Sequence, residues 1–159
     1  MAKSRDRALV EDLILSCAGG GVSSETAQKA IRAVCRYFGG QMVYIPARKE
    51  NGSSAEKLRG VIMDAVGEWQ AEKILEKIMI LYGGMQLYIP MERKAFLKTI
   101  ALEIYLRHRN GISMNDLARE YGISFNTGYK LWSIGQREKF KSSLPYLPFL
   151  EMTENINSG

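Results

Sequence analysis

The sequence predicts a mainly α-helical protein with a duplicated helix–helix–strand unit, a short two-stranded antiparallel ribbon and a C-terminal helix-turn-helix domain. Three observations support this fold class. Apolar residues recur at helical spacing along most of the chain. The segments at residues 39–46 and 83–90 both begin Gly-Gly and end Tyr-Ile-Pro. Residues 113–132 place capping and turn residues where two helices joined by a tight turn need them.

The first unit, predicted over residues 1–50, contains two helices and a strand. Apolar spacing predicts one helix over residues 5–17 and a second that ends at Phe38. Glycines at 19–21 separate these helices, and Ser23 or Ser24 can cap the second. Two further glycines stop it, and a strand over residues 42–45 is predicted to end at Pro46.

The second unit, predicted over residues 51–91, repeats this pattern at an offset of 44 residues. Gly67 separates its helices, and its strand covers residues 86–89. A four-residue strand cannot satisfy its own backbone groups, so the simplest partner for each strand is the other. We therefore expect a two-stranded antiparallel ribbon under a helical bundle, related by an internal pseudo-two-fold axis. The residues expected at the ribbon and in dimerisation are Val43, Tyr44, Ile45, Leu87, Tyr88 and Ile89.

The helix-turn-helix domain is predicted over residues 92–141. One helix is expected over residues 91–109, and the chain then turns into a shorter helix capped by Ser113. Gly122 can adopt positive φ and close the tight turn, and Ser124 can cap a last helix that runs to about residue 139. Residues 142–159 are expected to form an irregular tail packed on the domain; a short docking motif for another protein is the alternative.

In a helix-turn-helix, the second helix enters the DNA major groove by its N-terminal residues. Asparagine can pair with adenine there, and lysine can reach guanine or a phosphate. The residues predicted to read bases are Ser124, Asn126, Tyr129 and Lys130. The residues predicted to contact phosphates are Arg119, Thr127, Arg137 and Lys139. An α-hairpin whose glycine merely ends a helix is the alternative.

The positive charge of the chain coincides with this domain. Residues 91–141 carry ten Lys or Arg against five Asp or Glu, whereas residues 1–90 carry twelve against ten. A local excess of this kind is typical of a phosphate-binding face, although a solvated basic helix surface would also give it.

Other function classes find little support in the residues. Cys17 and Cys35 lie in apolar helical patterns, which predicts buried free thiols. His108 is the sole histidine, so a metal site or a catalytic triad has few residues to use. No apolar run reaches the roughly 20 residues that a membrane span needs. Scattered acids argue against a DNA-processing enzyme such as a recombinase, and the Gly-Gly pairs end helices rather than forming phosphate loops. We expect a cytoplasmic protein without enzyme activity, cofactor or metal.

The segment from Gly83 to Pro90, followed by Asn110-Gly111, Leu117, Tyr121-Gly122, Phe125-Asn126-Thr127 and Tyr129-Lys130, resembles the Mor/C family of transcription activators from Mu-like phages. The resemblance covers about residues 66–139. It implies an N-terminal dimerisation region of helices and a strand, joined to a C-terminal helix-turn-helix. It also implies a homodimer on a two-fold promoter element, acting with host RNA polymerase on the nucleoid of a bacterial host.

Two features depart from the family pattern. Gly128 falls on the inner face of the last helix, where it costs about 1 kcal/mol in helix propensity and is expected to leave a packing gap. The other departure is the extra unit over residues 5–46. Pairing of the two units within one chain would give a monomeric pseudo-dimer with a single reading head. Pairing between chains would keep the homodimer.

The function predicted from the sequence is therefore that of a sequence-specific regulator that binds double-stranded DNA. A phage or prophage activator of a middle or late operon fits best. The alternative is an interaction protein, a degenerate family member whose helix-turn-helix or duplicated unit docks a protein partner.

Overall fold

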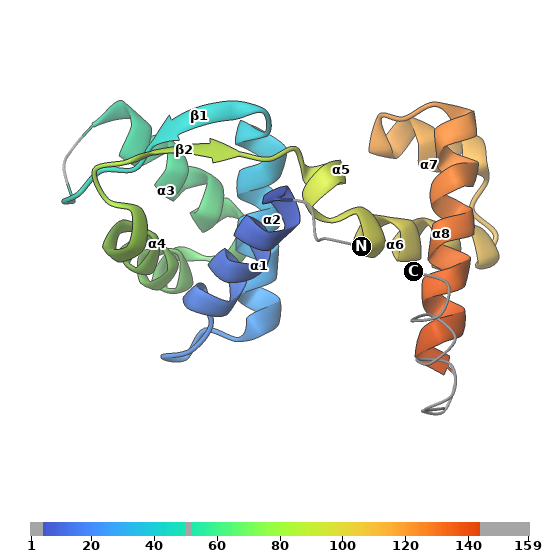
Figure 1. Cartoon of the computed structure of the whole chain (residues 1–159), viewed down its shortest axis with the longest axis horizontal. Coiled ribbons are helices and arrows are strands. Elements are labelled where there is room, and N and C mark those ends of the chain that lie inside the picture. The colour runs from blue at the N-terminus through green and yellow to red at the C-terminus, as the bar shows by residue number, and fades with distance from the viewer. Residues whose placement is uncertain (1–4, 50–51, 144–159) are drawn as a thin grey trace, which may run out of the picture. The chain divides into compact units, whose positions relative to one another are not determined.

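The computed structural model of the chain describes residues 5–49 and 52–143, and it is mainly helical with one small antiparallel sheet (Figure 1). The described residues divide into two compact units, with the boundary between Phe96 and Leu97. Among the residues described, no helix is both long enough and apolar enough to cross a membrane.

The first compact unit begins with α1 (Arg5–Cys17), α2 (Ser24–Phe38) and β1 (Gln41–Tyr44). The predicted cap of α2 is confirmed, because the Ser23 Oγ accepts a hydrogen bond from the Thr26 N–H at 3.0 Å. The apolar spacing that predicts this helix corresponds to a buried face, whose members are Ala27, Ala30, Ile31, Val34 and Phe38. The strand begins and ends one residue earlier than predicted, at Gln41 and Tyr44. Ile45, the predicted last residue, lies just outside it and donates its N–H to the Met85 carbonyl at 2.9 Å.

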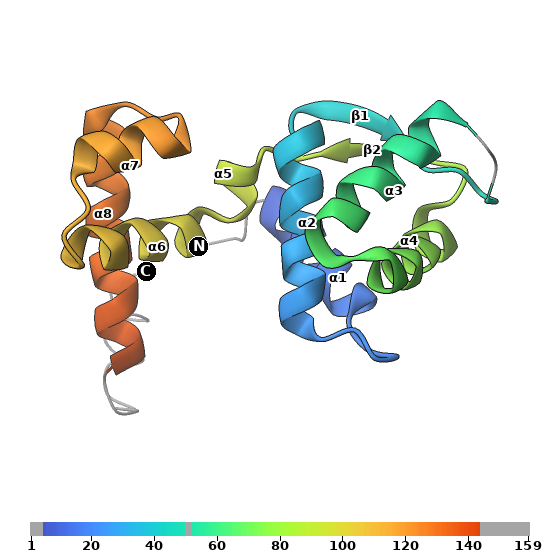
Figure 2. The same ribbon diagram turned by 180° about the vertical axis from the view of Figure 1, so that it is seen from behind.

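The same unit continues with α3 (Ser53–Val66), α4 (Glu68–Tyr82) and β2 (Gln86–Ile89). The helix break at Gly67 and the second strand lie where the sequence predicts them. The ribbon of β1 and β2 lies along one side of the helices α1 to α4, and α2 packs against both strands (Figures 1 and 2).

The predicted antiparallel ribbon is present, and its two strands pair within the chain. Val43 lies opposite Leu87, and Tyr44 lies opposite Gln86. The two ends of the ribbon are built alike. The Gly40 N–H donates to the Ile89 carbonyl at 2.8 Å, and the Gly84 N–H, 44 residues later, donates to the Ile45 carbonyl at 2.7 Å.

The first glycine of each pair allows a close backbone approach. A Cβ at Gly39 would lie 3.0 Å from the Met91 Cα, and a Cβ at Gly83 would lie 3.0 Å from the Ala47 Cα. Met91 and Ala47 are themselves 44 residues apart, so the two contacts are equivalent. At the end of α2 the chain that leaves β2 passes close by, and at the end of α4 the chain that leaves β1 does so. Only glycine leaves room for the backbone at these two places.

Lys77 on α4 closes the C-terminal end of α1. Its Nζ donates to the carbonyls of Cys17 at 3.2 Å, Ala18 at 3.1 Å and Gly19 at 3.0 Å. The last turn of α1 has no basic residue of its own, and the carbonyls at a helix end lack partners within the helix. Lys77 on α4 therefore supplies the positive charge and the hydrogen-bond donor that the end of α1 lacks in its own sequence.

The single helix predicted over residues 91–109 is wrong. The structure has α5 (Glu92–Ala95) and α6 (Leu97–Arg109), separated at Phe96, where φ is −113° and ψ is 32°. Glu92 is held by Arg32 on α2, with Nε and Oε1 2.7 Å apart, and by Arg36. Tertiary contacts thus keep α5 in the first unit, and the break falls where the second unit begins.

The second compact unit is formed by α6, α7 (Met114–Tyr121) and α8 (Phe125–Ser143). Its core contains the buried apolar residues Ile100, Ala101, Ile104, Met114, Leu117, Ala118 and Leu131. The helix α8 extends past the predicted end near residue 139 and includes the first two residues of the predicted irregular tail. The rest of that predicted tail, residues 144–159, lies outside the described residues.

Two glycines of α8 are buried against neighbouring helices. The packing gap expected at Gly128 is wrong, because Met114 fills it: a Cβ there would lie 2.6 Å from the Met114 Sδ. Gly135 contacts the backbone of α6, where a Cβ would collide with the Ala101 carbonyl and lie 2.8 Å from the Tyr105 Cβ. The flexible Met114 side chain can adapt to what stands at position 128. The backbone of α6 cannot, so the close crossing of α6 and α8 requires a glycine at position 135.

Candidate nucleic-acid interface

A tight turn between α7 and α8 is built from the residues predicted for it. Ser113 caps α7, since its Oγ accepts from the Asp116 N–H at 3.1 Å. Gly122 ends the helix with φ 63° and ψ 37°, in the left-handed region that favours glycine. The Ile123 N–H donates to the Ala118 carbonyl at 2.9 Å and the Gly122 N–H donates to the Arg119 carbonyl at 3.3 Å, the Schellman pattern of a helix end.

The first turn of α8 is held by Ser124 and Thr127. The Ser124 Oγ accepts from the Thr127 N–H at 3.1 Å and donates to the Thr127 Oγ1 at 2.8 Å. Ser124 was predicted to read a base and Thr127 to contact a phosphate. Their hydroxyls bond to each other here, so both side chains first serve to hold the start of the helix.

Two of the predicted base-reading residues are one turn apart on α8, and both are exposed: Asn126 and Lys130. Arg137 falls on the same side, about 20° round the helix from Asn126 and roughly 16 Å further along, at 100° and 1.5 Å per residue. We call Asn126, Lys130 and Arg137 the basic face of α8. Lys139 lies about 140° round the helix from Asn126 and is not part of this face.

Carboxylates near the basic face are already paired. Glu138 is the only acidic residue in α8, and its Oε1 lies 3.6 Å from the Lys98 Nζ. By contrast, the two cations of the basic face, Lys130 and Arg137, are exposed and form no ion pair within residues 5–49 and 52–143, and the same holds for Arg119 and Lys139 elsewhere on α7 and α8. A positive potential therefore remains on this surface, which is what a phosphate backbone requires of a partner.

Arg107 on α6 forms an ion pair with Glu120 on α7. Its two terminal nitrogens donate to the two carboxylate oxygens of Glu120, each at 2.8 Å. These hydrogen bonds lower the pKa of Glu120 below its usual range and raise the pKa of Arg107. Partial burial raises the pKa of Tyr121, whose hydroxyl donates to Glu103 at 2.9 Å. These partners set the position of α7 on α6.

Aromatic side chains gather at the start of α8. The Phe125 and Tyr129 rings are 5.0 Å apart between centroids at 69°, and their side chains are 47% and 40% exposed. The Tyr129 ring also meets the His108 ring edge-on at 5.9 Å. Phe125 was not among the residues predicted to read bases; its place at the first position of α8, next to Asn126, was the available signal.

The residues predicted for the ribbon lie on two sides of it. Val43, Ile45 and Ile89 are buried in the core of the first unit, and Leu87 is half-buried. Tyr44 and Tyr88 point outward and are 48% and 44% exposed. Of the six residues, only the two tyrosines present substantial side-chain surface to another molecule.

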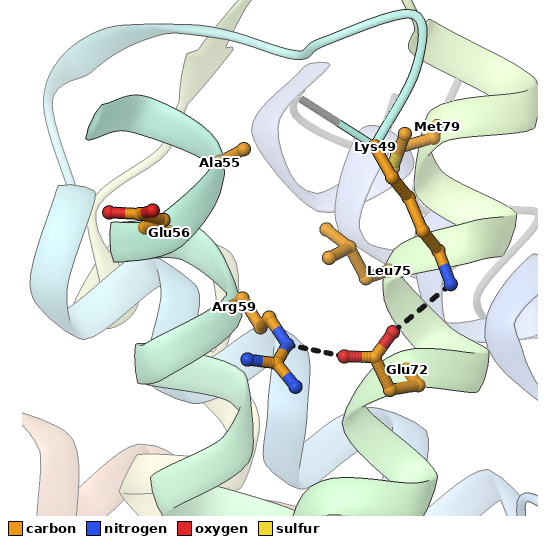
Figure 3. A pocket seen from close by; sticks show the side chains of 7 residues that line it. All are labelled: Lys49, Ala55, Glu56, Arg59, Glu72, Leu75 and Met79. Atoms are coloured by element: carbon orange, nitrogen blue, oxygen red, sulfur yellow. Dashed lines mark hydrogen bonds and ion pairs between the residues drawn. The ribbon is translucent and has the colours of Figure 1, made fainter. Parts of the chain in front are cut away.

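A shallow pocket of about 280 Å³ lies between α3 and α4 (Figure 3). Arg59 and Lys49 both point at Glu72, with Lys49 Nζ 3.2 Å from its carboxylate, and these hydrogen bonds lower the pKa of Glu72. Glu72 is therefore neutralised by the two cations that point at it. Within the described ranges, no three histidine, cysteine or acidic side chains cluster as metal ligands.

The cysteines are inert by their surroundings. Both are free and buried, as predicted. Burial raises the pKa of the Cys17 thiol to about 11, despite the opposing effect of nearby Lys77, and raises that of Cys35 to about 12. Thiols that stay protonated are poor nucleophiles, so neither cysteine is a candidate reactive group.

The model of the Mor transcription activator family matches residues 48–145, more than half of the chain. The protein belongs to the Mor transcription activator family. The Mor match runs from just before α3 through α8, so it covers the tight turn and the basic face, while the helices α1 and α2 lie outside it. The predicted family is thereby confirmed, and its description is that of a regulator of transcription rather than an enzyme. No curated protein and no solved structure matches the sequence.

Proposed function

We propose that this Mor-family protein is a sequence-specific activator that binds double-stranded DNA through α7 and α8, acting as a helix-turn-helix. The observation that carries the proposal is the basic face of α8. It begins at the end of the helix that would enter a major groove, it lacks carboxylates, and the cations on it are unpaired within the described ranges.

The roles follow from chemistry and position. Asn126 and Lys130 read base edges, with Tyr129 and Ser124 beside them. Arg119, Arg137, Thr127 and Lys139 supply phosphate contacts, and the placement of Arg137 on the basic face makes it the strongest of these. By the family resemblance, the target is a promoter of a phage or prophage operon, and host RNA polymerase is the partner that the bound protein recruits.

We further propose that residues 1–50 and 51–91 are a duplicated unit, and that α6, α7 and α8 form the DNA-binding domain predicted over residues 92–141, with α5 left on the first compact unit. The equivalent contacts at an offset of 44 residues support the duplication. Pairing of β1 with β2 in one chain supports a monomeric pseudo-dimer, because the ribbon needs no strand from a second chain. A homodimer, as the family resemblance implies, is the competing assembly.

The test is selection of binding sites by the purified full-length protein from random duplexes, followed by nuclease footprinting of the selected site. We expect protection that is lost in Asn126→Ala and kept in Lys57→Ala, an exposed change on α3. The Asn126→Ala variant should also lose about 1–3 kcal/mol of base preference at one position of the site. One protected segment fits the pseudo-dimer, whereas two segments about 10 base pairs apart fit a homodimer.

The second candidate is an interaction protein that docks a protein partner. The outer side of the ribbon favours it, because Met42, Tyr44 and Tyr88 are 58%, 48% and 44% exposed there. Selection without enrichment, together with absence of salt-dependent binding to any duplex, would favour this candidate over the DNA-binding activator.

A further inference from the structure

The start of α8 carries an exposed aromatic pair, Phe125 and Tyr129, that the basic face does not account for. Phe125 is the first residue of the helix and is 47% exposed. Leaving much of an aromatic ring in water forgoes stabilisation that burial would give. An exposed apolar group next to polar residues is a common mark of a binding surface.

The pair is held in one arrangement by the residues behind it. Tyr129 contacts Phe125 edge-on at 5.0 Å and His108 edge-on at 5.9 Å. The His108 ring is fixed by a 2.9 Å hydrogen bond between its Nδ1 and the Ile112 carbonyl. The Phe125 ring therefore rests on a packed support, which reduces the entropy that it would lose on binding a partner.

Another exposed phenylalanine on the same helix lacks such support. Phe140 is 63% exposed near the far end of α8, and it makes no ring contact with any aromatic residue that the structure describes. The exposed ring of Phe125 is thus held by contacts with other aromatic rings, whereas the exposed ring of Phe140 is not.

Resting on the proposed function, we propose that Phe125 reads thymine methyl groups in the major groove, with Tyr129 as the residue that positions its ring. The C5 methyl of thymine is the one apolar group that a base pair presents in that groove, and phenylalanine is among the side chains suited to cover it. Asn126, the next residue, is suited to adenine. The two neighbours together select sites that contain A·T pairs at adjacent steps.

The test replaces each thymine of the selected duplex by uracil, one position at a time. This change removes the methyl group and keeps the pairing and the O4 acceptor. At one or two positions the affinity of the unaltered protein should fall about fourfold, the value of withdrawing one methyl group from apolar contact. Phe125→Ala should bind the thymine and uracil duplexes equally at those positions.

Matched variants separate the ring contact from general damage. Phe140→Ala should keep the full uracil effect, since it removes an exposed ring elsewhere on α8. Tyr129→Phe should keep it too, because the ring that supports Phe125 remains, whereas Tyr129→Ala should reduce it. A circular-dichroism melt of each variant checks that α8 stays folded.

Three results would overturn the proposal. If the protein binds its site specifically and no uracil substitution lowers the affinity, the proposed methyl contact is wrong, while the proposed DNA-binding function stands. A uracil effect that persists in Phe125→Ala would assign the methyl contact to another residue. Normal DNA affinity of Phe125→Ala with loss of transcription activation would make Phe125 a protein contact. Failure of the proposed function itself is distinct, since no site would then be selected.

Discussion

Arg137 and Lys139 are both exposed basic residues near the end of α8, but they lie on different sides of the helix. Arg137 shares the side of Asn126, and Lys139 faces about 140° away from it. The sequence alone treats the two as equivalent phosphate contacts. Helix periodicity combined with the burial of Gly128, Leu131 and Gly135 separates them, because it shows which side of α8 the core occupies.

We predict that Arg137→Ala lowers DNA affinity equally for all sequences, because a phosphate contact carries no base information. The slope of log affinity against log salt should become shallower by about 1. Binding measured from 50 to 200 mM salt gives the slope. Lys139→Ala should change the slope less, and the reverse order of effects would contradict the assignment of the basic face.

The two buried glycines of α8 should respond differently to alanine. Gly135→Ala forces a Cβ against the backbone of α6, which cannot yield without moving the helix, so we predict a loss of about 1–3 kcal/mol in the free energy of unfolding. Gly128→Ala meets only the flexible Met114 side chain and gains helix propensity, so its change should stay within about 1 kcal/mol.

Urea unfolding followed by circular dichroism measures both glycine changes. Gly60→Ala on α3 is the control, since nothing lies within 4 Å of the added methyl group, and it should stabilise by about 0.4–1 kcal/mol. Equal losses at Gly128 and Gly135 would contradict the close crossing of α6 and α8.

At the scale of the element, the end of α1 depends on Lys77. Replacing it by methionine keeps much of the aliphatic stem and removes the donor to three carbonyls. We predict that Lys77→Met lowers the free energy of unfolding by about 1–3 kcal/mol. Lys73→Met, one turn earlier on α4, is the control and should cost less. Faster amide exchange in α1 of the Lys77 variant would locate the effect.

The short helix α5 depends on the pairing of Glu92 with Arg32 and Arg36. Partial burial acts to raise the pKa of Glu92, but the hydrogen bonds from Arg36 and Arg32 outweigh it, so the pKa lies below the ordinary 4.5. A carboxylate with a lowered pKa stabilises the fold at pH values above its unfolded pKa, and the stabilisation is lost as pH falls through the folded pKa.

We therefore predict that Glu92→Gln destabilises the protein by about 1–3 kcal/mol at pH 7. The difference from the unaltered protein should shrink as pH falls below 4.5, because the glutamate then becomes neutral as well. Thermal unfolding of both proteins from pH 7 to pH 3 measures it. A difference that does not change with pH would mean that the charge of Glu92 has no part in holding α5.

At the scale of the whole molecule, the pairing of the ribbon strands is relevant to whether the protein is a monomer or a homodimer. Its strands are paired within one chain, and its inner residues are buried in the first unit. If the proposed pseudo-dimer is correct, sedimentation equilibrium at micromolar concentration should give the mass of one chain, 17.9 kDa. Twice that mass, with two protected segments in the footprint, would support the homodimer instead.

Local patterns were enough to predict most of the elements. The helices over residues 5–17 and 24–38, the strand over residues 86–89, and the caps at Ser23, Ser113 and Ser124 all lie where spacing and capping chemistry place them. These features depend on residues three or four positions apart, and such neighbours are visible in a sequence. The repeat made the pairing of β1 with β2 predictable as well, because each strand needed a partner.

Tertiary structure decided the features that depend on residues far apart in the chain. Lys77 closes a helix about 60 residues earlier, and Glu92 meets Arg32 at the same separation. The break at Phe96 and the filling of the space beside Gly128 by Met114 follow from packing, which no local pattern encodes. The same holds at the candidate interface: the sequence named its residues, and the fold decided which side of α8 is buried and placed His108 against Tyr129, behind Phe125. Sequence spacing fixes the side of a helix on which a residue lies, but only the packing of that helix decides whether that side meets core or solvent.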